Sequence, residues 1–217
     1  MMESFEKQLH KLHDELNQLG DLVCDAIDLA INSFKTYDLG MARRVVESDT
    51  QIDSVEKLVE ARALKLLLEN DLKVEELRMI STALKVITDM ERIGDQAADI
   101  AEILLYYKKG PMKSDLSQVF NMAELAREMV RGSIEAFTNQ DLGTACRIIK
   151  SDDEVDSLFS DIRDSVIDRL VRNRDLADEA VDIIMITKYL ERIGDHATNI
   201  GEWTIFAKTG KHKEHKK

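Results

Sequence analysis

The feature that most constrains this chain is an internal duplication, because short runs recur about one hundred residues later. The Asp-Leu-Gly run at 38–40 recurs at 141–143, an offset of 103 residues. The Glu-Arg-Ile-Gly-Asp run at 91–95 recurs at 191–195, an offset of 100. The three lost residues fall in a stretch that contains a predicted turn at 68–71, and a loop changes length more easily than a helix. The chain therefore reads as two copies of one folding unit.

Each unit is predicted to contain three helices. In the first, apolar residues recur at steps of four and three from Phe5 to Phe34, which is typical of the seam of an antiparallel bundle. Asp38 is placed to cap a second helix, which reaches past Leu66. A third helix is expected from about Val74 to Tyr107, and the second unit repeats this plan.

Helix breakers are scarce and fall where the units should join. The 217 residues include one proline and nine glycines, which favours long uninterrupted helices over a sheet with many turns. Pro111 follows Gly110 directly and marks the joint. We therefore predict an all-α fold of two tandem three-helix bundles, sharing an interface or placed end to end, at 1–108 and 115–208. Residues 209–217 are expected to form a basic, disordered tail.

Charge and composition exclude several classes of protein. The net charge of −12, from 42 acidic and 30 basic residues, argues against nucleic-acid binding because it repels a phosphate backbone. No run approaches the ~18 apolar residues of a transmembrane helix, and the start at Met1 lacks signal-peptide features, so a cytoplasmic protein is expected. Cys24 and Cys146 lack CxxC spacing and are predicted to be two buried thiols.

Four acidic pairs at helical spacing recur in register in the second and third helices of the units, two in each unit. Residues four apart hold their Cβ atoms ~6 Å apart on one face of a helix. Two such pairs on adjacent helices would present four carboxylates to one patch. The pairs are Asp49/Asp53 with Glu91/Asp95, and Asp152/Asp156 with Glu191/Asp195.

Grouped carboxylates need a partner. Two of them 6 Å apart repel by roughly 3 kcal/mol at an effective dielectric near 20, so they protonate, pair with arginine or bind a metal. Arg92 and Arg192 adjoin the motif but lie about 100° around the helix from the neighbouring glutamates. Oxygen-only ligands favour iron, manganese, magnesium or calcium, and we predict the eight acids above as metal ligands. The alternative is a solvated surface with ordinary salt bridges.

Three further residues in the third helices bear on this prediction. Gly94 and Gly194 lie in mid-helix, where glycine costs ~1 kcal/mol relative to alanine, so they indicate close approach by a neighbouring backbone, a ligand or a packed side chain. His196 could add a nitrogen ligand, but the duplicate position holds Gln96, so a surface position or a pairing role is the simpler expectation.

An enzyme is the less favoured interpretation. A carboxylate-bridged di-iron oxidase needs Glu-x-x-His pairs, and none of the five histidines has a glutamate three residues before it. No P-loop, GxSxG or zinc-protease motif occurs either. The sequence thus predicts a protein that is not an enzyme.

The duplicated motifs resemble the PhoU family, most closely in the run 191–200. The resemblance implies a regulator that contacts the ATPase subunit of the phosphate ABC transporter, a sensor histidine kinase, or both. It would restrain phosphate uptake and the starvation response when phosphate is plentiful. It also implies a homodimer, multinuclear metal sites with iron as the first candidate, and peripheral association with a membrane transporter complex. Asn199 stands where the first unit has Asp99, so the two sites need not bind metal equally. The alternative is a metal-free helical adaptor with unrelated partners.

Overall fold

The computed structural model of the chain describes residues 5–69, 72–107 and 109–211. This part of the chain is helical and contains no strand, which confirms the predicted all-α class. The first unit contains α1 (Phe5–Thr36), α2 (Leu39–Leu67) and α3 (Val74–Tyr106). The second contains α4 (Ser117–Asn139), α5 (Leu142–Arg172) and α6 (Ala177–Thr209), with a short 3-10 helix, η1 (Arg174–Leu176), before α6.

The repeated Asp-Leu-Gly run is a helix start. The Asp38 side chain accepts a hydrogen bond from the Met41 backbone N–H at 2.9 Å. Asp141 does the same for the N–H groups of Gly143, at 2.8 Å, and Thr144, at 3.2 Å. Such side-chain bonds satisfy donors that the first turn of a helix leaves unpaired. The duplication therefore preserved a cap that fixes where the second helix of each unit begins.

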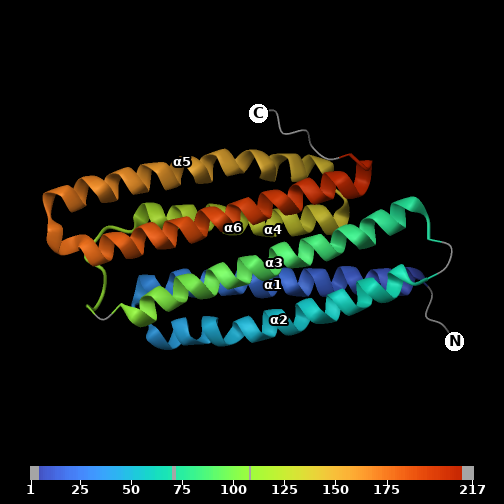
Figure 1. Cartoon of the computed structure of the whole chain (residues 1–217), viewed down its shortest axis with the longest axis horizontal. Coiled ribbons are helices and arrows are strands. Elements are labelled where there is room, and N and C mark those ends of the chain that lie inside the picture. Colours follow the sequence, from blue (N-terminus) through green and yellow to red (C-terminus); the bar gives the residue numbers. More distant parts are fainter. Residues whose placement is uncertain (1–4, 70–71, 108, 212–217) are drawn as a thin grey trace.

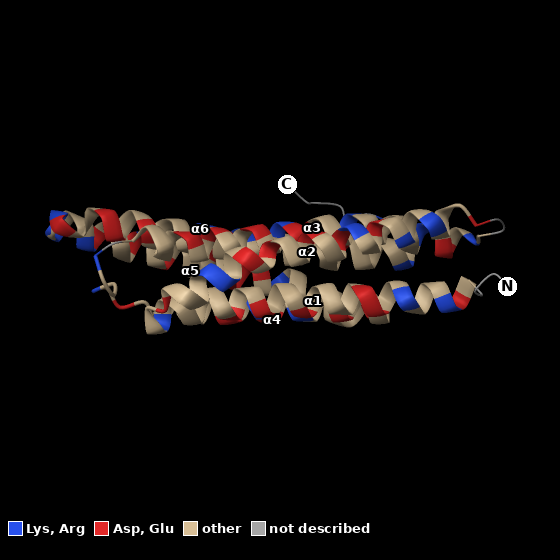
Figure 2. Ribbon diagram, turned by 90° about the horizontal axis from the view of Figure 1, so that it is seen from below, with Lys and Arg blue, Asp and Glu red and all other residues tan. Residues whose placement is uncertain are grey.

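The six helices form two layers. Helices α2, α3, α6 and α5 lie side by side in one layer, and α1 and α4 lie against it in the other (Figures 1 and 2). The units thus share an interface, and of the two arrangements left open by the sequence the end-to-end one is not adopted. The α2–α3 and α5–α6 turns lie at opposite ends of the molecule (Figure 1). An approximate twofold relation between the units follows, with α3 and α6 at its centre.

One hydrophobic core runs through both units. The predicted seam of α1 is buried from Leu12 to Ile31, and α3 and α6 contribute buried residues along most of their lengths. By contrast α5 buries few residues, since it packs at the outer edge of its layer. Cys24 is buried, but Cys146 on α5 is exposed, so the prediction of two buried thiols is wrong for Cys146.

Two other predictions concern the chain as a whole. Across the described helices, none is long and apolar enough to cross a membrane. Most of the predicted basic tail, residues 212–217, lies outside the described residues, and α6 ends at Thr209.

Candidate functional site

In the first unit the predicted carboxylates of α2 and α3 lie near one another. The pKa of Asp49 is raised by burial and then by the charges of Asp95, Asp53 and Asp99. The pKa of Glu91 is raised by burial and by Asp95, and the nearby Arg92 offsets part of that rise. Because like charges raise a carboxyl pKa only when they are close, the helices bring these acids into one patch.

The second unit builds the same patch between α5 and α6. Burial first, and then Asp195 and Asp156, raise the pKa of Asp152 to about 6. The pKa of Asp195 is raised by burial, Glu191 and Asp156, and is partly lowered again by Lys188 and His196. The eight predicted site residues therefore occupy two matching patches, one in each unit. Asp99, which the sequence analysis named as a difference between the two sites but not among the eight ligands, adds its charge to the first patch.

One carboxylate in each patch has an oxygen without a partner. Asp49 Oδ1 and Asp152 Oδ1 are buried and, among the described residues, accept no hydrogen bond. The Thr198 hydroxyl is close enough to lower the pKa of Asp152 slightly, yet its oxygen also lacks a partner there. A buried, unpaired carboxylate oxygen is costly, so these two atoms are the strongest sign that the patches accept a ligand.

The mid-helix glycines make room for these carboxylates. A Cβ at Gly194 would lie 3.2 Å from Asp152 Oδ1, and one at Gly94 would lie 3.7 Å from Asp49 Oδ1. Gly94 also receives the Ile52 side chain, whose Cδ1 would be only 2.9 Å from that Cβ. Of the roles that the sequence left open, close side-chain packing from the neighbouring helix is the one observed.

Cations neutralise the patches only in part. Arg92 Nη1 lies 3.0 Å from Asp95 Oδ2, and its Nε lies 3.4 Å from Glu91 Oε2. In the second unit Lys188 pairs with Glu191. Within the part of the chain that the structure describes, no ion pair reaches Asp49 or Asp152. The expectation that arginine alone would not neutralise the acids agrees with this geometry.

The fit to a metal is chemical rather than geometric. Oxygen donors and two unpaired buried oxygens suit a hard cation. However, no three His, Cys, Asp or Glu side chains among the described residues converge closely enough to hold an ion. Binding would therefore require carboxylate side chains to rotate, and metal binding stays a prediction.

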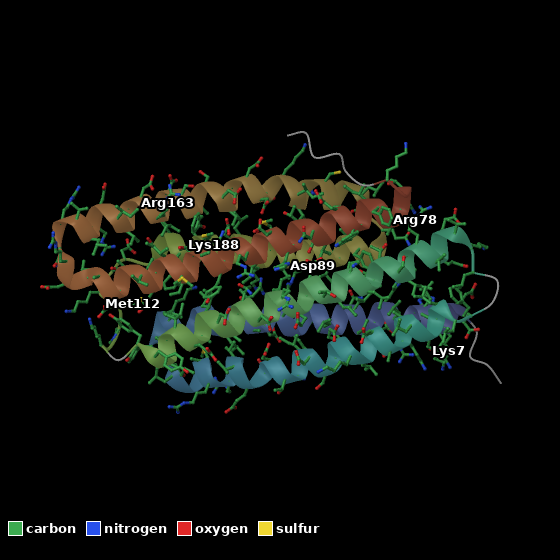
Figure 3. All side chains as sticks on the ribbon, viewed as in Figure 1. Lys7, Arg78, Asp89, Met112, Arg163 and Lys188 are labelled. Carbon is green, nitrogen blue, oxygen red and sulfur yellow. The ribbon has the colours of Figure 1, made fainter. Side chains whose placement is uncertain are left out.

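His196 belongs to a different feature, a joint between the two units. Asp89 on α3 lies 2.9 Å from His196 Nδ1 and accepts hydrogen bonds from Asn199 Nδ2 at 3.2 Å and Trp203 Nε1 at 3.1 Å, all from α6. Figure 3 shows Asp89 near the middle of the molecule, between these helices. A carboxylate at position 199 would face Asp89, which explains why Asn199 departs from Asp99. Of the two roles left open for His196, a surface residue or a pairing partner, the structure shows pairing.

The duplicate of this joint has opposite chemistry. Tyr189 stands at the position equivalent to Asp89, and its hydroxyl is close enough to Asp99, the equivalent of Asn199, to lower the pKa of that carboxyl. Arg192 lies close enough to Asp99 to lower its pKa, although burial and the acids Glu102 and Asp95 raise it more. The sequence could have pointed to these residues, because they are positions at which the two repeats differ.

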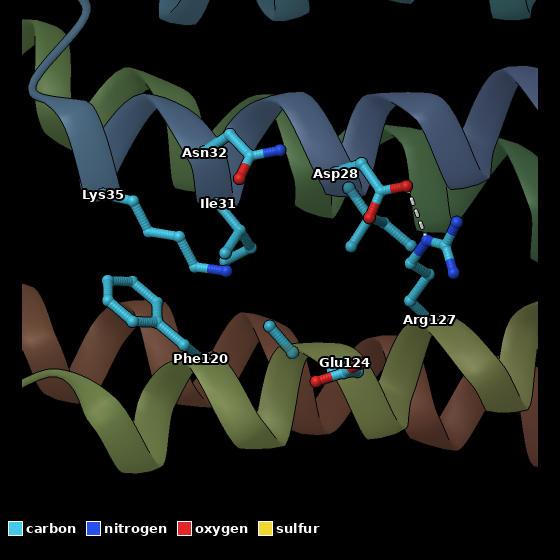
Figure 4. A pocket seen from close by; sticks show the side chains of 9 residues that line it. Asp28, Ile31, Asn32, Lys35, Phe120, Glu124 and Arg127 are labelled. Atoms are coloured by element: carbon cyan, nitrogen blue, oxygen red, sulfur yellow. Dashed lines mark hydrogen bonds and ion pairs between the residues drawn. The ribbon is translucent and has the colours of Figure 1, made fainter.

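Cavities occur in both layers. One of about 510 Å³ adjoins the second patch and includes Asp152 and Asp195 in its lining. Another, of about 320 Å³, lies between α1 and α4 (Figure 4). Its cations are already engaged, since Arg127 Nε pairs with Asp28 Oδ2 at 2.6 Å and Lys35 Nζ lies 5.0 Å from the centre of the Phe120 ring. The cavity beside Asp152 is therefore the better candidate for a ligand.

Comparison with known proteins gives consistent results for both units. Residues 16–104 and 119–204 each match the family model described as the PhoU domain. A relative from Clostridium acetobutylicum, named phosphate-specific transport system accessory protein PhoU homolog, is 31% identical and covers 95% of both chains. PhoU homolog 1 from Thermotoga maritima is 34% identical over 95% of this chain and 90% of its own.

Solved structures agree with the sequence relatives. The crystal structure of PhoU from Pseudomonas aeruginosa superposes with a TM-score of 0.91 at 27% identity, covering 96% of this chain and 100% of that one. The phosphate transport system regulatory protein PhoU from Streptococcus pneumoniae gives 0.90 at 25% identity, covering 97% and 100%. The similarity therefore extends over both units and their arrangement.

Proposed function

The chain belongs to the PhoU family, and from that premise we propose that it is an accessory protein that regulates phosphate transport and phosphate-starvation signalling. The observation that carries this proposal is the match of both units to the PhoU domain, in relatives named as accessory or regulatory proteins of phosphate transport systems. It restrains uptake and the starvation response when phosphate is plentiful. This role is regulatory and needs no catalytic chemistry.

The proposed mode of action is contact with protein partners. The ATPase subunit of the phosphate ABC transporter, a sensor histidine kinase, or both are the expected partners. Two similar units with matching acidic patches suit a partner that itself has twofold symmetry, as an ATPase dimer does. The protein would then work in the cytoplasm, associated peripherally with the transporter complex, and as a homodimer.

Deletion of the gene tests the function. Phosphate uptake and starvation-gene expression should stay high in phosphate-rich medium, and the wild-type gene should restore their repression. A pull-down from the complemented strain should contain the transporter ATPase subunit or a histidine kinase. Normal repression in the deletion strain, with no second family member present, would overturn the proposal.

We also propose that the two patches hold metal, with iron first and manganese, magnesium or calcium as alternatives. The unpaired oxygens of Asp49 and Asp152 support this. Protein purified without chelator should carry metal. Replacing Asp49, Asp53 and Asp95 with Asn and Glu91 with Gln should remove the metal bound by the first unit. The matched four-residue change in the second unit is the control. Failure of the wild-type protein to bind any of the four metals would favour the metal-free adaptor.

A further inference from the structure

A groove between α3 and α6 is lined by none of the eight acids of the two patches. It has a volume of about 490 Å³ and opens near the C-terminal end of α3. We call it the tyrosine groove. Its lining combines carboxylates and phenol rings with a single cation, and consists of Asp99, Glu102, Ile103, Tyr106, Tyr107, Lys109, Asp178, Asp182 and Tyr189.

The acids of the tyrosine groove outnumber its cations. Lys109 is paired with Asp178, and the Tyr189 hydroxyl lies close to Asp99. The pKa of Asp182 is raised by burial and then by Asp178 and Glu179, and Lys109 offsets only part of that rise. Four carboxylates thus face one lysine across a space that no side chain of the described chain fills. Such a surface attracts a positive charge from outside.

The duplicate of this groove shows what occupies the equivalent position on the other side. At the equivalent positions, 100 residues away, the duplicate has Arg78 for Asp178, Thr82 for Asp182 and Trp203 for Ile103. The Arg78 guanidinium lies against the end of α6, within 2.9–3.1 Å of a Cβ built on Gly210 (Figure 3). A cation there also complements the negative end of the helix dipole.

In the tyrosine groove no arginine stands at the position of Arg78, and the one lining cation, Lys109, comes from the linker and is already paired with Asp178. Gly110 is the equivalent of Gly210, and both have a left-handed φ, of 82° and 71°. Yet nothing lies within 4 Å of a Cβ built on Gly110. Gly210 is the C-cap of α6, whereas Gly110 lies in the linker beyond Tyr107, the C-cap of α3. The arginine that covers the end of α6 therefore has no counterpart at Gly110, and acids stand where the duplicate has the arginine and the threonine.

We propose that the tyrosine groove docks an arginine- or lysine-bearing segment of a partner protein, whose cation takes the place that Arg78 takes in the duplicate. Exposed Tyr106 supplies an aromatic face for the cation, and Glu102 and Asp182 supply carboxylates. The inference goes beyond the proposed function, which assigns no surface and holds whether or not this groove is used.

Direct binding tests this proposal with a defined probe. A fluorescein-labelled peptide that alternates arginine and glycine is titrated with the purified full-length protein, and anisotropy is measured. The Glu102→Gln/Asp182→Asn variant should weaken binding by about tenfold or more, because two facing charges are lost. Asp21→Asn/Asp25→Asn on the exposed surface of α1 removes the same charge and should change affinity by less than about twofold.

A second variant copies the duplicate. Asp178→Arg should place an internal guanidinium in the groove and abolish probe binding, whereas Asp25→Arg, with the same change in net charge, should leave it largely intact. Circular dichroism verifies that all variants keep their helix content. Equal losses in groove and control variants would show attraction to the whole acidic protein and overturn the proposal.

The identity of the occupant has its own test. Unlabelled peptide should displace the probe, whereas spermidine at equal charge should displace it much less. Equal displacement by spermidine would assign the groove to small polyamines instead of a protein segment and would overturn the proposal. Because these measurements use purified protein, they fail or succeed independently of the deletion strain.

Discussion

The two joints between α3 and α6 occupy duplicate positions but are built from opposite chemistry. On one side Asp89 of α3 accepts hydrogen bonds from three groups of α6. On the other side the Tyr189 hydroxyl lies close enough to Asp99 to lower the pKa of that carboxyl, and both residues line the tyrosine groove. The comparison shows how a duplicated unit becomes asymmetric at its own interface.

The physical reason lies in the approximate twofold relation. It places position 89 of α3 opposite position 199 of α6, and position 99 opposite position 189. An unchanged duplication would bring identical carboxylates together, and their repulsion in a partly buried site would oppose docking of the units. In this chain each of the two contacts instead places one carboxylate of α3 opposite hydrogen-bond donors of α6, which relieves this repulsion. The acidic patches adjoin these contacts through Asp99 and His196, but their eight acids are other residues, and their motifs could stay alike.

The largest effect is expected at the Asp89 joint. Asp89→Ala should lower the free energy of unfolding by about 2–3 kcal/mol, because three donors lose a charged acceptor that is only 13% exposed. Guanidinium unfolding at pH 7 measures this loss. Tyr189→Phe on the opposite side removes a single hydroxyl and should cost about 0.5–1.5 kcal/mol. A larger cost for Tyr189→Phe would reverse the comparison.

The second-largest loss of stability is expected at Glu179, which binds the linker between the two units. Glu179, which is 4% exposed, accepts hydrogen bonds from Tyr107 Oη at 3.0 Å and from the N–H groups of Lys113 at 3.1 Å and Ser114 at 2.7 Å. The equivalent residue of the first unit is Met79, which cannot accept these hydrogen bonds through a carboxylate. Glu179→Gln should cost about 1–2 kcal/mol at pH 7.

The pH dependence of this difference follows from the Glu179 pKa. Burial alone would raise it, but the bonds from Ser114, Lys113 and Tyr107 lower it below its usual value of 4.5. The stabilisation is therefore fully present above pH 4.5 and is lost as the pH falls through the lower, folded-state pKa. Urea unfolding from pH 7 to pH 3 should show wild type and Glu179→Gln converging. Met79→Leu, the control, should show no such convergence.

A smaller effect is expected at the mid-helix glycines. Gly94→Ala brings a methyl group to 2.9 Å from Ile52 Cδ1, and the overlap should outweigh the gain in helix propensity by about 1 kcal/mol. Gly194→Ala meets nothing closer than 3.2 Å and should be nearly neutral. Thermal unfolding compares the two.

A rescue variant sharpens this test. Val155 stands in the second unit where Ile52 stands in the first. Ile52→Val removes the clashing Cδ1 atom, so the double variant with Gly94→Ala should regain most of the lost stability. If it does not, the overlap with Ile52 is not the cause.

The surface ion pairs of the patches should matter least. Arg92 is 53% exposed and Lys188 is 46% exposed, and such pairs contribute little in water. Arg92→Ala and Lys188→Ala should each change the free energy of unfolding by less than about 0.5 kcal/mol. A loss above about 1 kcal/mol in either variant, measured by chemical unfolding in chelator, would mean that the cation anchors its patch.

The sequence alone determined the helices, their duplication and the acid spacing. Helical periodicity, the Asp38 and Asp141 caps and the scarcity of breakers are local properties, and each can be recognised within a few turns of chain. The eight acids followed from the same periodicity, since i and i+4 share a face in any helix. These features needed no knowledge of which helices touch.

Only the tertiary structure decided how the two units meet. The side-by-side packing, the Asp89 joint, the exposed Cys146 and the tyrosine groove depend on which faces of helices far apart in sequence come together. The unpaired oxygens of Asp49 and Asp152 likewise depend on burial by a second helix. A helix carries the same local pattern at the edge or at the centre of a layer, and only the packing of all six selects between these places.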